Sequence, residues 1–77
     1  MNKKRRERLQ AAVAHLEMAT GIVEDVRNDE QDSLDNMPEN LRQSERYSLM
    51  EDAIDYLEDA VSYLNDANDL IKQACDN

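Results

Sequence analysis

The residues best suited to binding chemistry lie in the centre of the chain, in the segment DNMPENLRQSERY at positions 35–47. Arg42 and Arg46 are one helical turn apart around Ser44, a residue type that favours a helix N-cap. Guanidinium groups and the free N–H groups of a helix N-terminus attract anions, and the ring of Tyr47 can stack on a planar group. The segment therefore predicts a site for an anion or a nucleotide phosphate.

The same segment has a purely structural interpretation. Met37, Pro38 and Leu41 can cover the end of a helical bundle while the two arginines pair with nearby acidic side chains. The segment is longer than a minimal connection between two helices, which keeps the ligand hypothesis in place beside the structural one.

The basic start of the chain is a second candidate for ligand contact. Residues 1–8 contain five basic residues and one acidic residue, for a charge of +4, whereas the other 69 residues carry four basic and 17 acidic residues, for −13. Cations at a helix N-terminus oppose the helix dipole, so their presence needs a reason. They either contact a phosphate group or neutralise acidic helices of their own assembly. The candidate residues here are Lys3, Lys4, Arg5 and Arg6.

Patterns for catalysis and metal binding are missing from the sequence. His15 is the only histidine and has no metal-binding partner spacing, so we expect a packing or surface role. Asp29, Asp32 and Asp35 lack the glycine and the alternating ligands of a calcium loop. No nucleophile elbow or P-loop occurs. We therefore predict no enzymatic activity, no cofactor and no metal site.

The second half of the chain repeats every seven residues, because MEDAIDY, LEDAVSY, LNDANDL and IKQACDN fill residues 50–77 without a gap. Apolar spacings of three and four are typical of a helix packed against another helix. The predicted oligomer seam consists of Met50, Ala53, Leu57, Ala60, Leu64, Ala67, Ile71 and Ala74. Over the first half, the same register gives the large positions Leu9, Leu16 and Val23 and the small positions Ala12, Ala19 and Val26.

The apolar stripe of the second half is wider than one partner helix requires. Four of seven heptad positions are apolar or aromatic, against the two that a single coiled-coil partner needs. Alanine alternating with leucine also permits close helix approach. We therefore expect hairpins to pair into a four-helix bundle or to form a larger ring. The flanking residues are Ile54 and Val61 on one side, and Leu49, Tyr56, Tyr63 and Leu70 on the other.

Length and composition indicate a single all-α domain over residues 1–77. With only one glycine and one proline, the chain lacks the turn residues that separate β-strands. Its 77 residues are close to the minimum for one hydrophobic core. We predict an antiparallel two-helix hairpin with helix one at about 3–34, a loop at about 35–43 and helix two at about 44–75. Ser44 is the expected N-cap of helix two, although Ser48 and Glu51 also have capping-box spacing.

Charge and cysteine usage indicate the cellular compartment and the classes of partner to expect. A lone Cys75 and the lack of an apolar leader favour a reduced, cytoplasmic protein, with Cys75 as a small buried or half-buried apolar residue. No segment has the character of a membrane anchor. The charge of −13 outside the first eight residues disfavours contact with long nucleic acid.

The NKKRR start, the DNMPENLxxSERY centre and the acidic DAIDYLEDA repeat resemble those of short hypothetical proteins of Firmicute-type phages and prophages. The resemblance covers nearly the whole chain, and its distinctive part is the central segment. It assigns no site residues. It implies a small accessory protein that binds and disables a host or defence component in the cytoplasm of a bacterium.

These observations predict a non-enzymatic homo-oligomer that binds and inhibits a host protein through its acidic helices or its central loop. One alternative is a sponge for a nucleotide signal, built from Arg42, Arg46 and Tyr47 with the basic end of another protomer. Antiparallel pairing of two hairpins would bring those two segments together. Another alternative is a DNA mimic, because regular carboxylates on a rigid rod suit that role.

Overall fold

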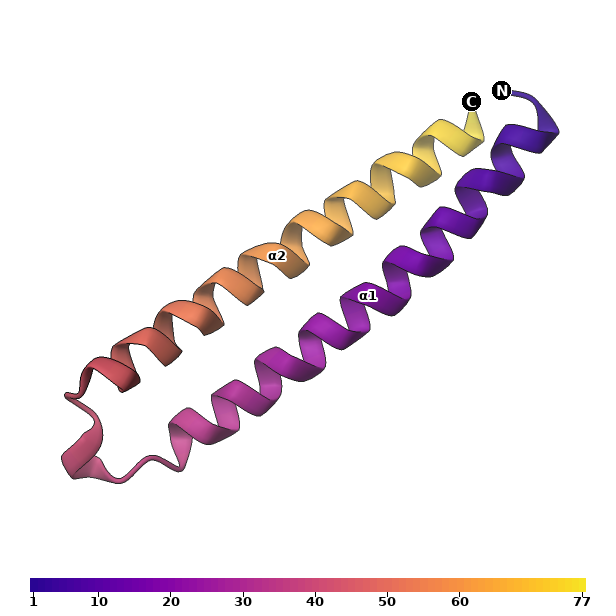
Figure 1. The fold of residues 1–77 in the computed structure, drawn as a ribbon. Helices are drawn as coiled ribbons and strands as arrows, with labels where there is room; N and C mark the ends of the chain where they lie inside the picture. Colours follow the sequence, from indigo (N-terminus) through magenta and orange to yellow (C-terminus); the bar gives the residue numbers. More distant parts are fainter.

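Two long antiparallel helices make up the whole chain, and the computed structural model describes residues 1–77 (Figure 1). Helix α1 spans Lys3–Asp35, the 3₁₀ turn η1 spans Glu39–Leu41, and helix α2 spans Glu45–Asp76. The hairpin is a rod of 59 × 14 × 13 Å with both chain ends at one end and the loop at the other. The predicted all-α antiparallel hairpin is confirmed. Each helix ends one residue later than the sequence pattern indicated.

Both helices begin at a polar side chain that caps their free N–H groups. Asn2 accepts a hydrogen bond from the N–H of Arg5 through its Oδ1, at 2.8 Å. Ser44 accepts one from the N–H of Tyr47 through its Oγ, at 3.2 Å. Each bond satisfies a donor that has no partner within the helix. Ser44, and not the alternative Ser48, is therefore the N-cap of α2.

The end of α1 follows from the Met37–Pro38 pair. A proline disfavours the helical conformation in the residue before it, so the helix cannot continue through Met37. Asn36 closes the last turn, because its main-chain N–H and its Nδ2 both donate to the carbonyl of Asp32, at 3.1 and 2.8 Å. Pro38 then precedes the single turn of η1.

The hairpin has a very small core at its loop end. Only four of 77 residues are buried, and the three apolar ones, Leu34, Met50 and Ile54, are in mutual contact. Met37 of the loop and Tyr47 of the first turn of α2 pack against this cluster. Farther along the rod the contacts between α1 and α2 are only half-buried, because neither helix has a second partner to cover it.

All eight predicted seam residues of α2 are buried or half-buried, yet the centre of the contact lies to one side of them. Ile54, predicted as a flank, is the most buried residue of the chain at 4% exposure. On α1 the predicted small positions Ala19 and Val26 are exposed, and the buried Thr20 and half-buried Arg27 take their place. The register assigned to α1 was therefore wrong at Ala19 and Val26, whereas its other positions are half-buried: Leu9, Ala12, Leu16 and Val23. Because each helix has only one partner helix, it buries only one side of its apolar stripe.

Two polar side chains lie inside this contact. Thr20 is buried and donates through its Oγ1 to the carbonyl of Leu16 at 2.7 Å, which satisfies it within its own helix. Asn68 is half-buried in the row that contains Ile54 and Val61, and its Oδ1 is buried without a hydrogen-bond partner. Neither helix has an apolar stretch of the length that crossing a bilayer requires.

Candidate functional site

The arginine predicted to bind an anion in the central loop binds the loop itself. Arg42 donates through its Nε to the carbonyl of Met37 at 3.3 Å, and through its Nη2 to the carbonyl of Asp35 at 3.4 Å. The guanidinium thereby ties η1 to the end of α1. Carbonyl groups at a helix C-terminus attract cations because of the helix dipole, which explains this placement. Arg42 thus has a structural role in the hairpin.

The other loop candidates are divided between packing and solvent. Ser44 donates through its Oγ to the carbonyl of Leu41 at 2.6 Å while it caps α2. Tyr47 is half-buried against the Leu34 cluster, so its ring is not free for stacking on a ligand. Arg46 is exposed. Leu41 is 47% exposed in the single hairpin.

The basic start of α1 lies at the opposite end of the rod from the loop (Figure 1). Lys3, Lys4 and Arg5 are exposed, whereas Arg6 donates through its Nε to the carbonyl of Cys75 at 3.0 Å. That bond joins the start of α1 to the last turn of α2, whose free carbonyl groups attract a cation. One hairpin therefore separates the two predicted ligand-binding segments by most of its 59 Å length.

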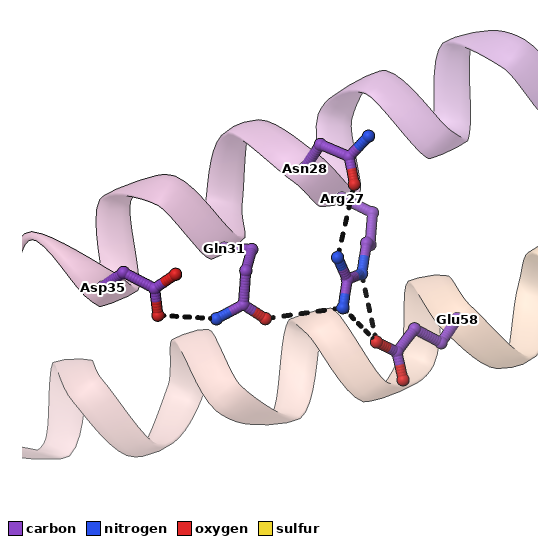
Figure 2. Close-up of polar contacts among 5 residues, drawn as sticks. All are labelled: Arg27, Asn28, Gln31, Asp35 and Glu58. Carbon is purple, nitrogen blue, oxygen red and sulfur yellow. Dashed lines mark hydrogen bonds and ion pairs between the residues drawn. The ribbon is translucent and has the colours of Figure 1, made fainter.

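A polar network in the loop half was not predicted from the sequence. Arg27 donates through Nε and Nη2 to Oε1 of Glu58 across the groove between the helices, the Nε bond at 3.1 Å (Figure 2). Its Nη2 also donates to Gln31 at 3.5 Å, and Gln31 donates to Asp35 at 2.9 Å. A charged pair that is 29% and 49% exposed contributes little net stability, about 0–1 kcal/mol.

The ion pairs define one face of the hairpin. Besides Arg27–Glu58, the only other pair joins Lys72 to Glu17 at 3.5 Å. Glu17 directly follows the seam residue Leu16, and Lys72 directly follows Ile71. Successive residues of a helix are rotated by about 100°, so the residues that follow the large seam positions of both helices point to this one face. The residues that precede the large seam positions point to the other.

That other face is apolar and uncovered. We define the apolar face as Ile22 and Val26 of α1 together with Leu49, Tyr56, Tyr63 and Leu70 of α2, and the alanine row at positions 53, 60 and 67 between them. Tyr56 and Tyr63 are each 73% exposed, and Ile22 is 61% exposed. Large apolar side chains grouped in this way mark an interaction surface. The predicted width of the stripe on α2 is therefore matched by the surface that one hairpin leaves uncovered.

Depressions on the surface are open and small. One of about 320 Å³ is lined by Glu24, Arg27, Asn28, Glu58 and Val61, and thus surrounds the ion pair of Figure 2. No group of three or more His, Cys, Asp or Glu side chains is arranged to hold a metal ion. His15 is exposed and Cys75 is half-buried. The surfaces with functional potential are therefore the apolar face and the exposed carboxylates.

Comparison with protein-family models, with curated proteins and with solved structures found no match to this chain. The candidate surfaces are consequently judged on their own geometry and charge.

Proposed function

We propose that this chain is a non-enzymatic, self-associating binding protein of the phage accessory type. It binds and inhibits a host or defence component of the bacterial cytoplasm through its acidic helices or its central loop. The observation that carries this proposal is the surface of the hairpin, which combines one uncovered apolar face with an acidic remainder.

The shape of the hairpin supports action by surface contact. Its depressions have volumes of about 260–430 Å³ and are lined by four to six residues each. Small-molecule sites usually enclose most of the ligand surface. The open depressions between two antiparallel helices cannot enclose a ligand in this way. Partner proteins, in contrast, bind to extended and nearly flat surfaces.

Self-association is supported by the deficit of buried residues. A stable domain of this size buries roughly 60% of the surface of its unfolded chain, and most of that burial comes from its core. Here the core has three apolar residues, while Tyr56, Tyr63 and Leu70 are 73%, 73% and 64% exposed. Covering those side chains in a four-helix bundle or a larger ring would supply the missing burial.

The acidic surface supports a basic partner. Carboxylates along α2 are exposed at positions 51, 52, 55, 58, 59, 66 and 69, and only Glu58 is engaged in an ion pair. A surface of one sign attracts a partner of the opposite sign and raises the rate of encounter. The row formed by Asp52, Asp59 and Asp66 repeats every seven residues along a rigid helix. This regularity favours DNA mimicry as the second candidate function.

The nucleotide sponge receives less support. Within one hairpin, Arg42 is bound to two carbonyl groups and Tyr47 is packed against the core. A nucleotide would have to displace both sets of contacts. Calorimetric titration of cyclic and linear nucleotides into the protein should therefore detect no heat of binding.

The proposal is tested by capture of a target and by inhibition with purified components. We expect the native chain to retain a basic host protein and to inhibit its activity. A variant with Asp52→Asn, Asp59→Asn and Asp66→Asn should lose that retention. The control is Arg46→Ala, which changes an exposed residue, leaves the acidic row intact and should still bind. Equal binding by the neutralised variant would reject the acidic surface as the site. An unchanged activity of the purified target would reject inhibition.

A further inference from the structure

The rod is strongly asymmetric in charge along its length. The half that contains the chain ends, residues 1–20 and 65–77, has six basic and five acidic residues, for a net charge of +1. The loop half, residues 21–64, has three basic and 13 acidic residues, for a net charge of −10. Two copies that pack side by side must therefore place the loop half either against another loop half or against a terminal half.

Two rows of residues at seven-residue spacing lie on the side of the hairpin that carries the apolar face, one on each helix. On α2 the row reads Leu49, Tyr56, Tyr63, Leu70, which is the same in both directions. On α1 the row reads Arg8, His15, Ile22, Asp29, with a cation at one end and an anion at the other. Residues seven apart lie on the same face of a helix, and all eight of these residues are exposed in one hairpin.

We propose that a second copy of this chain covers the apolar face in the antiparallel orientation, so that the terminal end of each hairpin lies over the loop end of its partner. This inference rests on the self-association in the proposed function and adds the surface and the direction of pairing. A two-fold interface joins the same patch of both subunits, and therefore requires a patch that is complementary to itself after reversal. The α2 row meets that requirement along its length, and the α1 row meets it at its charged ends, Arg8 and Asp29.

Reversal of the α2 row places Tyr56 opposite Tyr63 of the partner subunit and Leu49 opposite Leu70 of the partner subunit. At 73% exposure, the two rings of one copy present roughly 220–370 Å² for burial. The aliphatic side chains and alanines of the apolar face add to this area. The sum approaches the roughly 800 Å² that each partner contributes to a stable interface.

Charge decides between the two directions. Packed helices are about 8–10 Å apart, which is comparable to the screening length of about 8 Å at physiological salt. Facing charges of two copies therefore still interact. The parallel orientation would place a charge of −10 against a charge of −10, whereas the antiparallel orientation places each −10 half against a +1 half. It also brings Arg8 to Asp29 of the partner subunit, which gives the basic start of α1 a role in assembly.

Distances between spin labels test the direction of pairing directly. A label is attached at the loop end through Glu39→Cys, in a background that carries Cys75→Ser, and circular dichroism verifies that the variant remains helical. Two copies labelled at residue 39 should show a long distance, close to the 59 Å length of the rod. Mixing these copies with copies labelled through Asn77→Cys should produce a short distance, because one loop end then lies over the other copy's terminal end.

The outcomes separate this inference from the proposed function. A short distance between two residue-39 labels would overturn the antiparallel orientation and leave self-association intact. No distance between copies in any sample would overturn both. A charge exchange gives an independent test. Arg8→Glu should raise the dissociation constant of the dimer by about five- to thirtyfold, because two ion pairs per dimer become repulsive. Adding Asp29→Arg should restore it, and failure of this rescue would reject the Arg8–Asp29 pairing.

Discussion

Replacement of Asn68 by leucine should stabilise the hairpin, because it removes a polar group that the fold does not satisfy. Asn68 occupies the row of Ile54 and Val61 between the helices, and its buried Oδ1 has no hydrogen-bond partner. An unsatisfied buried acceptor costs about 1–3 kcal/mol, and the half-buried side chain places this case toward the lower limit. We expect the free energy of unfolding to rise by about 1–1.5 kcal/mol in the Asn68→Leu variant.

The matched control is Asn65→Leu, which makes the same exchange at an exposed position of the same helix. It measures the gain from helix propensity alone, which amounts to a few tenths of a kcal/mol. Urea unfolding followed by circular dichroism, at one fixed protein concentration, gives both values. A difference of about 1 kcal/mol between the variants corresponds to a shift in Tm of roughly 4–8 °C. Equal stability of the two variants would refute the assignment of an uncompensated acceptor.

Three further substitutions probe single features of the fold. Gly21→Ala should raise the free energy of unfolding by about 0.5–1 kcal/mol, because the added Cβ meets nothing within 4 Å; a lower Tm would contradict this. Ser44→Ala should lower it by about 0.5–2 kcal/mol through loss of the N-cap, whereas Ser48→Ala, on an exposed residue, should have little effect in the same urea titration. Ala60→Leu should weaken self-association, because it enlarges the alanine row where helices approach closely; unchanged association in sedimentation equilibrium would argue against that approach.

The fold follows from sequence features that act locally. Ser44 specifies the start of α2 because its Oγ can satisfy a free N–H group wherever a helix begins. The Met37–Pro38 pair specifies the end of α1 because the proline excludes the helical conformation one residue earlier. The heptads then require the two helices to pack together.

The seven-residue periodicity does not predict which part of its apolar stripe each helix buries against the other. Four adjacent rows of α2 are apolar, and a single partner helix covers only part of them. Arg27 and Glu58 join the helices on one face, which leaves Ile54 at the centre of the contact and Tyr56 outside it. That choice depends on polar residues of both helices at once, so a pattern read along one helix cannot reveal it.

The partner of Arg42 could not be predicted from the sequence for a similar reason. The spacing of Arg42 and Arg46 around Ser44 is compatible with anion binding, but the free carbonyl groups at the end of α1 attract Arg42 in the folded chain. Those carbonyl groups become neighbours of Arg42 only after η1 forms. A residue's type and spacing therefore identify its chemistry, whereas the nearest partner is set by the turn of the backbone.

One hairpin leaves its apolar face uncovered, and we propose that a second copy of the chain covers it. Sedimentation velocity of the native chain over a range of micromolar concentrations tests this claim most directly, because it measures mass without labels or variants. The account predicts a mass of at least twice the 8.9 kDa of one chain, decreasing toward that value only on dilution. A mass of 8.9 kDa at every concentration would contradict it.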